Sequence, residues 1–80
     1  MRLEHKVALI TGASAGIGRE TALLSAREGA KVAVNGQSDR GQAVVDEIAK
    51  AGGQAVFVQG KVEDPDDAHR MVEETVEAFG

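Results

Sequence analysis

Three glycines and a serine near the N-terminus have the residue types and the spacing to bind an anion. Gly12, Gly16 and Gly18 lie between an apolar run and a helical pattern, and Ser14 stands between the first two. The N-terminus of a helix leaves backbone N–H groups unpaired and carries about half a positive charge. A phosphate placed there would accept those N–H bonds, and Ser14 would add a hydroxyl donor.

Each glycine of this turn has its own use. Gly12 permits a tight turn, Gly16 lets a ligand approach the backbone, and Gly18 lets the helix pack closely on the strand. The spacing G-x-x-x-G-x-G differs from the G-x-G-x-x-G dinucleotide fingerprint, and the missing Gly-Lys-Ser/Thr excludes a P-loop. The alternative is a tight strand–helix turn that holds no ligand. The place of the turn at the start of a repeated strand–helix pattern favours the ligand site.

The elements that would position this turn alternate between strands and helices. We expect strands at 7–10, 31–35 and 54–59, and helices at 16–28, 40–51 and 65–79. Short connections between them predict an α/β fold with a parallel sheet and right-handed crossovers. The predicted strand order is 3-2-1, with the third helix on the opposite face of the sheet from the other two. The apolar run 7–10 is expected to be a strand buried on both faces.

Hydrophobic periodicity predicts which side of each helix faces the core. In the first helix, Ile17, Thr21 and Leu24 form one stripe, with Ala22 and Ala26 beside it. The inward residues predicted for the other two helices are Val44, Val45, Ile48 and Ala49, and then Ala68, Met71, Val72, Thr75, Val76 and Phe79. The expected N-caps are Ser38 or Asp39 for the second helix and Asp64, followed by Pro65, for the third.

The composition limits the classes of function. Eighty residues make one small domain, and a net charge of −4 argues against bulk binding of nucleic acid or an anionic membrane. There is no cysteine for a disulfide or a thiolate metal site, and no apolar run approaches the ~20 residues of a membrane span. The charged N-terminus leads straight into the first strand and leaves no room for a signal peptide, so we expect a cytoplasmic protein.

The glycine turn resembles the T-G-x-x-x-G-I-G cofactor motif of the short-chain dehydrogenases/reductases, and here it reads Thr11-Gly12-Ala13-Ser14-Ala15-Gly16-Ile17-Gly18. Residues 6–10, 29–32 and 77–80 also fit, and the resemblance covers essentially the whole chain. It is strongest to 3-oxoacyl-(acyl-carrier-protein) reductase-like and glucose dehydrogenase-like members. The resemblance implies that residues 1–80 are the N-terminal part of a single Rossmann-type NAD(P)-binding domain. It also implies an oxidoreductase that moves a hydride between NAD(P)(H) and an alcohol or carbonyl.

The resemblance also implies a set of cofactor-binding residues. The pyrophosphate and the adenosine ribose would be held by Gly12, Ser14, Ala15, Gly16, Ile17 and Gly18. The 2′-position of that ribose would lie beside Asn35, Gly36, Gln37 and Ser38, and the adenine beside Lys61 and Val62.

Two departures from the family pattern bear on the cofactor. Members that prefer NAD usually carry an acidic residue where Gly36 stands, and members that prefer NADP often carry Arg or Lys at Ala15 or Gln37. This chain has neither the acidic residue nor the Arg or Lys at these positions, although Arg40 is close. Because no carboxylate is present to repel a 2′-phosphate, NADP is favoured over NAD. Lys61 replaces the usual Asp and cannot accept a hydrogen bond from the adenine amino group. It would approach a 2′-phosphate or remain a solvated lysine.

The chemistry of the family requires a Tyr-x-x-x-Lys pair, a Ser and a structural Asn beyond the third helix, with the Tyr as general acid/base. This chain has no tyrosine, so we expect no catalytic residue in it and no turnover from it alone. A small-molecule substrate is expected only in the complete protein. The alternatives are a non-catalytic nucleotide-binding module and an inactive fragment.

Two further expectations concern partners and metals. The first strand would lie at an open edge of the sheet, which predicts either the remainder of a larger protein or a homo-oligomer. The acidic cluster is interpreted as helix capping rather than a metal site; it comprises Glu63, Asp64, Asp66 and Asp67. His5 and His69 are expected to be solvated.

Overall fold

The structure is a computed structural model that describes residues 5–12, 16–36 and 40–80. Along the chain the elements are β1 (Val7–Ile10), α1 (Gly16–Arg27), β2 (Lys31–Gly36), α2 (Arg40–Lys50), β3 (Gln54–Gln59) and α3 (Pro65–Phe79). Within this part of the chain the strands form a parallel sheet in the order β1-β2-β3, which is the predicted order read from the other edge. Every predicted element is confirmed, with ends that differ by at most one residue. The predicted caps of α2, Ser38 or Asp39, lie outside the described residues.

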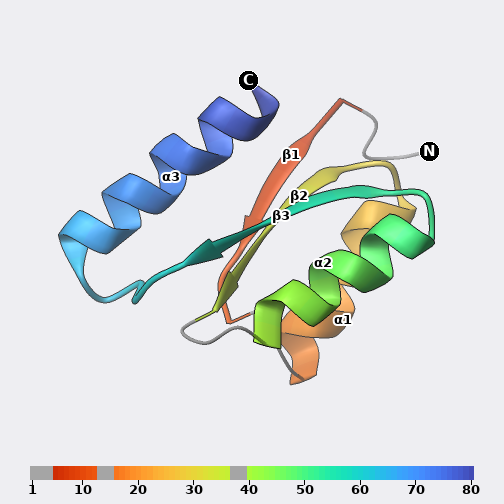
Figure 1. Cartoon of the computed structure of the whole chain (residues 1–80), viewed down its shortest axis with the longest axis horizontal. Coiled ribbons are helices and arrows are strands. Elements are labelled where there is room, and N and C mark those ends of the chain that lie inside the picture. Colours follow the sequence, from red (N-terminus) through yellow and green to blue (C-terminus); the bar gives the residue numbers. More distant parts are fainter. Residues whose placement is uncertain (1–4, 13–15, 37–39) are drawn as a thin grey trace.

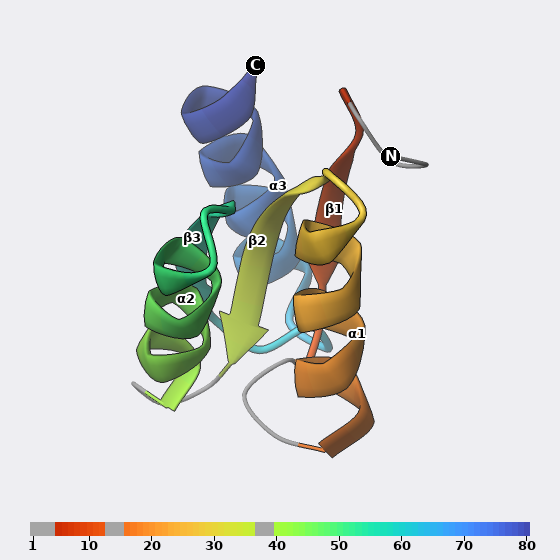
Figure 2. The same ribbon diagram turned by 90° about the vertical axis from the view of Figure 1, so that its right-hand side faces the viewer.

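The sheet is covered by helices on both faces (Figures 1 and 2). Because successive side chains of a strand point to opposite faces, Val32 and Val34 face α1 and α2, whereas Ala33 faces α3. The larger core therefore lies between the sheet and the first two helices, and a smaller one lies beneath α3 around Val58 and Met71. The predicted crossing of the third helix to the opposite face is confirmed.

The central strand, not the first one, is enclosed on both faces. All residues of β2 after Lys31 are buried, whereas Val7 of β1 is 46% exposed and the rest of β1 is half-buried. The prediction of a strand at 7–10 is confirmed, but its predicted burial on both faces is wrong. No strand of the described residues lies beyond β1, so its outer edge is uncovered.

The face that α1 turns towards the core differs from the predicted one. Ile17 and Leu24 are 86% and 56% exposed and Thr21 is also exposed, while Ala22 is fully buried with Leu23 and Ala26 packed beside it. The helix carries two apolar stripes, and it leans on β2 and α2, which bury only the stripe on that side. The stripe of Ile17, Thr21 and Leu24 was thus wrongly predicted to face the core.

The other two helices follow the predicted periodicity more closely. Val44, Val45 and Ile48 of α2 are buried as predicted, but Ala49 is exposed. On α3, Met71 and Thr75 are buried and Phe79 is half-buried, whereas Val72 and Val76 are exposed, because among the described residues nothing covers the outer flank of this helix. No helix in the described ranges is long and apolar enough to cross a lipid bilayer.

Candidate functional site

The carboxyl ends of the strands bring the predicted site residues to one edge of the sheet. β1 leads to Gly12, β2 ends at Gly36, and β3 leads to Gly60; the pairing of Gly36 with Gln59 sets the last two side by side. This edge lies at the lower end of the sheet in Figure 2. In open parallel sheets, ligands bind in the crevice outside this edge.

The glycine turn needs glycine for conformational reasons. Gly12 has φ +61° and Gly16 has φ +60°, a left-handed backbone that other residues adopt only with strain. A Cβ atom added at either position would meet no atom within 4 Å, so the space beside each of these two glycines is open. α1 begins at Gly16 and directs its unpaired N–H groups into this turn. The predicted use of Gly12 as a tight-turn residue agrees with this geometry.

The first turn of α1 adds one apolar side chain to this surface. Ile17 is exposed, Gly18 is half-buried, and Thr21 Oγ1 donates a 2.8 Å hydrogen bond to the Ile17 carbonyl. The turn thus presents backbone donors and an isoleucine side by side. Four other predicted site residues lie outside the described ranges: Ser14, Ala15, Gln37 and Ser38.

The end of β2 is tied to both neighbouring strands. The side chain of Asn35 is buried, and it accepts a 3.4 Å hydrogen bond from Gly12 N and donates to Gly60 O at 3.2 Å. The carbonyl of Gly36 accepts a 3.2 Å bond from Gly60 N. Asn35 therefore points into the protein, and Gly36 is the described residue that ends this strand at the rim.

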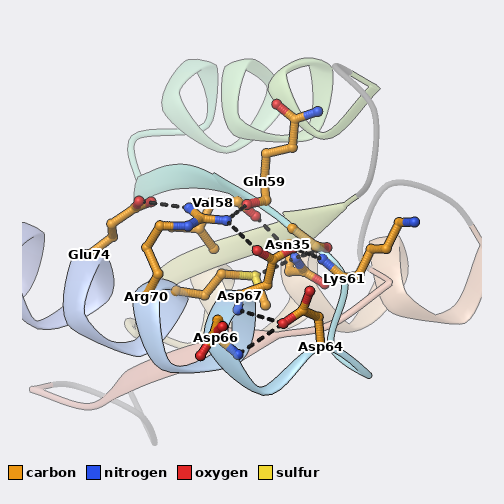
Figure 3. Close-up of polar contacts among 11 residues, drawn as sticks. Asn35, Val58, Gln59, Lys61, Asp64, Asp66, Asp67, Arg70 and Glu74 are labelled. Atoms are coloured by element: carbon orange, nitrogen blue, oxygen red, sulfur yellow. Dashed lines mark hydrogen bonds and ion pairs between the residues drawn. The ribbon is translucent and has the colours of Figure 1, made fainter.

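The turn between β3 and α3 is held by the acidic residues that precede and begin the helix (Figure 3). Asp64 caps α3: its Oδ1 accepts from Asp66 N at 2.9 Å and from Asp67 N at 3.4 Å. Asp67 Oδ2 in turn accepts from Lys61 N at 2.9 Å. The interpretation as helix capping is confirmed for Asp64, and Asp66 and Asp67 lie in the first turn with Pro65, as predicted.

Arg70 on α3 holds the same turn through hydrogen bonds and an ion pair. Arg70 donates to the Gln59 carbonyl at 2.6 Å and to Glu74 at 2.8 Å, and its guanidinium lies 3.7 Å from Asp67. The hydrogen bond to Glu74 raises the pKa of Arg70, so this side chain stays a cation. The side chain of Lys61 extends away from this cluster in Figure 3. Lys61 and Val62 are both exposed at the rim of the site.

A separate groove of about 640 Å³ lies at the opposite edge of the sheet, whereas hollows of about 600 and 350 Å³ lie beside Gly16 and Ile17 and beside Gly60 and Lys61. It is lined by the C-terminal ends of α1 and α2 and by residues that follow them, including Arg27 and Ala51. Helix C-termini present carbonyl oxygens and partial negative charge, which disfavour a phosphate. The helix dipoles therefore favour an anionic ligand at the edge with the glycine turn, although the cations Arg27 and Lys31 line the groove. Among the described residues, no group of three or more His, Asp or Glu side chains is placed to hold a metal ion.

The sequence model of the short chain dehydrogenase family matches residues 6–80. This chain belongs to the short-chain dehydrogenase family. It is 46% identical over 78 residues to a 3-oxoacyl-[acyl-carrier-protein] reductase of Staphylococcus epidermidis, covering 95% of this chain and 32% of that protein.

Solved structures of this family have the same fold. A short chain dehydrogenase from Mycobacterium avium superposes with a TM-score of 0.97 at 41% identity, covering all of this chain and 31% of that one. A 7α-hydroxysteroid dehydrogenase, complexed with NADH and 7-oxo glycochenodeoxycholic acid, gives a TM-score of 0.96 at 38% identity, covering 99% of this chain and 31% of that one. The chain spans about a third of the length of these short-chain dehydrogenases.

Sequence reasoning about this short-chain dehydrogenase missed two features of the site. The first is the inward orientation of Asn35. The sequence contains a signal for it, because this amide directly follows the apolar residues Val32, Ala33 and Val34. The second is the role of Asp67 and Arg70 in holding the turn after β3. Their spacing of three is compatible with any solvated helix, so no signal in the sequence singled them out.

Proposed function

We propose that this chain binds a nicotinamide dinucleotide at the glycine turn and forms the cofactor-binding part of an oxidoreductase. One observation carries the proposal: Gly12 and Gly16, both left-handed, flank a turn that leads from β1 to the N-terminus of α1, at the carboxyl edge of a parallel sheet. The open space where either Cβ would stand fits a ligand that approaches the backbone closely. Family membership and the NADH-bound relative support the same cofactor.

The residues proposed to hold the cofactor are those of the three strand ends. The pyrophosphate and ribose would contact Gly12, Ser14, Ala15, Gly16, Ile17 and Gly18. The ribose 2′-position would lie beside Asn35, Gly36, Gln37 and Ser38, and the adenine beside Lys61 and Val62. For Asn35 we propose an indirect part, because its side chain is already bonded inside the protein.

The bound dinucleotide would supply or accept the hydride exchanged with an alcohol or carbonyl substrate. The described residues hold and orient the cofactor: α1 offers N–H donors and positive potential for the pyrophosphate, and Ile17 offers an apolar surface. This chain has no tyrosine that would serve as the acid/base of the family's chemistry. We therefore infer that it binds the cofactor without turnover, and that a small-molecule substrate is bound only in a longer protein.

We infer that NADP is preferred over NAD. The end of β2, Asn35 and Gly36, offers no carboxylate that would repel a 2′-phosphate. The cationic side chain of Lys61 lies at the same edge and is extended away from Asp67, whose carboxylate is engaged with the backbone. NADPH is thus expected to bind more tightly than NADH, and equal affinities would contradict this preference.

The experiment that tests the proposal is a calorimetric titration of the chain with NADPH and with NADH, repeated on two alanine variants. Gly16→Ala places a side chain in the proposed site and should weaken binding at least about tenfold. Gly52→Ala is the matched control, because Gly52 also has a left-handed backbone (φ +89°) and open space around it, but lies at the opposite edge. It should lose stability and keep its affinity. Equal affinities of the two variants, or no saturable binding by the wild type, would contradict the proposal.

A further inference from the structure

A buried amide lies one residue before the end of the central strand, where apolar residues would be expected. Asn35 is 3% exposed and follows Val32, Ala33 and Val34, all of which are fully buried. Burying an unpaired amide costs free energy, so a buried asparagine needs partners for its donors and its acceptor. No buried side-chain nitrogen or oxygen of the described residues lacks such a partner.

The partners of Asn35 come from several parts of the chain. Its Nδ2 donates to Val58 O at 3.1 Å and to Gly60 O at 3.2 Å, and it lies 2.8 Å from Met71 Sδ. Its Oδ1 accepts from Gly12 N at 3.4 Å. The opposite orientation of the amide would set its oxygen against two carbonyl oxygens, so the chemistry of the neighbours fixes the orientation.

These bonds connect the two turns that flank the proposed cofactor site. Gly12 belongs to the glycine turn and Gly60 to the turn after β3, and neither has a side chain with which to reach the other. Between the described residues of these two turns there is no direct hydrogen bond. The amide of Asn35 stands between them and bonds to both (Figure 3 shows it beside Val58).

We propose that Asn35 is a positioning residue for the dinucleotide: it sets the separation between the glycine turn, proposed to hold the pyrophosphate, and the turn proposed to flank the adenine. The inference rests on the proposed function. Its physical basis is that a rigid ligand bound at both turns needs them at a fixed spacing before it arrives. Lys61 follows Gly60 directly, so the same amide also anchors the backbone that leads into Lys61.

The other buried polar side chain of the described residues provides a comparison. Thr75 is 6% exposed and lies on the buried face of α3, but its Oγ1 donates to Met71 O within the same helix. Thr75→Val removes a buried hydrogen bond without touching either turn. It is therefore a matched control for the loss of a buried polar group.

The variant Asn35→Asp makes the proposed role depend on pH. Its ionised carboxylate has no donor and faces the carbonyl oxygens of Val58 and Gly60, whereas its neutral acid can donate to one of them. Burial in this position raises the pKa of the introduced carboxyl above its ordinary value of about 3.9. As the pH falls through that raised pKa, the donor returns. The neighbouring charges of Lys61, Asp67 and Arg70 are the same in every variant, so the wild-type pH profile is the reference.

The test measures the dissociation constant of NADPH for the wild type, N35D and T75V at about pH 8 and about pH 5.5. We expect N35D to bind at least about tenfold more weakly than the wild type at the higher pH and to recover most of this loss at the lower pH. T75V should stay within about twofold of the wild type at both. Wild-type affinity of N35D at the higher pH, or a loss of the same size at both pH values, would overturn the inference while leaving the proposed function standing. Absence of wild-type binding would overturn both.

A second measurement on the unaltered protein keeps the inference testable even if N35D fails to fold. In ¹⁵N-resolved NMR spectra, saturation with NADPH should shift the side-chain amide signals of Asn35 together with the backbone signals of Gly12 and Gly60. The exposed side-chain amide of Gln42, which donates to Asp46 on α2, should stay unchanged. Unshifted Asn35 signals in a protein that binds NADPH would show that its amide does not report on the site, against the inference.

Discussion

Gly41 of α2 lies against the ring of Phe57 in the sheet, and adding one methyl group there should destabilise the fold. Gly41 is buried one residue into α2, and a Cβ atom would lie 2.4 and 2.6 Å from two ring carbons of Phe57 on β3. Carbon atoms pack best about 3.5–4.0 Å apart, so the ring would have to move by about 1 Å. Overpacking of this kind costs about 1–3 kcal/mol, and alanine returns up to about 1 kcal/mol of helix propensity. The expected net loss for Gly41→Ala is therefore about 0–2 kcal/mol, with a central value of about 1 kcal/mol.

Urea unfolding followed by circular dichroism measures this loss, which is a substantial part of the roughly 4–12 kcal/mol expected for 80 residues. The control is the same substitution in a Phe57→Val background, where the ring carbons are gone. There Gly41→Ala should be neutral or stabilising, because only the helix propensity remains. If Gly41→Ala costs the same free energy in both backgrounds, contact with Phe57 is not the reason for the glycine, and the reasoning is refuted.

Further predictions concern the cap of α3 and the contact between α1 and α2. Asp64→Ala should lower the free energy of unfolding by about 1 kcal/mol, because it removes the acceptor for two backbone N–H groups, whereas Asp66→Asn should have little effect. Equal thermal midpoints for these two variants would contradict the assignment of the cap. Arg19 makes two hydrogen bonds to Glu47, at 3.1 and 2.6 Å, and Glu47 raises the pKa of Arg19. Arg19→Ala should lower the thermal midpoint slightly at low salt and hardly at all at about 1 M salt; a loss that does not depend on salt would show that packing, not charge, matters there.

The order of elements was predictable because each boundary carries local chemistry. Gly12 and Gly16 permit the turn into α1, and Asp64 with Pro65 specifies the start of α3. The alternation of strands and helices then leaves few topologies, and the parallel order follows from right-handed crossovers. These signals involve only a few neighbouring residues, so they can be recognised without knowing which other elements pack against them.

The identity of the buried helix face was less predictable, because it depends on neighbours. Ile17 and Leu24 of α1 have the spacing of a core stripe, as do Val72 and Val76 of α3, yet all four are exposed. Periodicity indicates that a face is apolar, not that something covers it. Likewise, β1 has the composition of an enclosed strand but lies at the edge of the sheet formed by the described residues.

The site was predictable in its location but not in its internal bonding. The glycines and the strand ends indicated which edge would face a ligand. The bonds that join those ends depend on residues distant in the sequence, such as Asn35 with Gly12, 23 positions apart, and Arg70 with Gln59, 11 positions apart. The pairing of the strands and the packing of α3 on the sheet bring such pairs together, so these bonds depend on the complete fold.

The central claim is that the edge with the glycine turn, and not the larger groove at the opposite edge, binds the dinucleotide. Site-resolved NMR during a titration with NADPH tests this most directly, because both edges contain glycines with distinct backbone signals. We expect saturable shifts of Gly12, Gly16 and Gly18, with Gly52 and Gly53 of the groove unaffected. Shifts centred on Gly52 and Gly53, with the glycine turn unmoved, would contradict it.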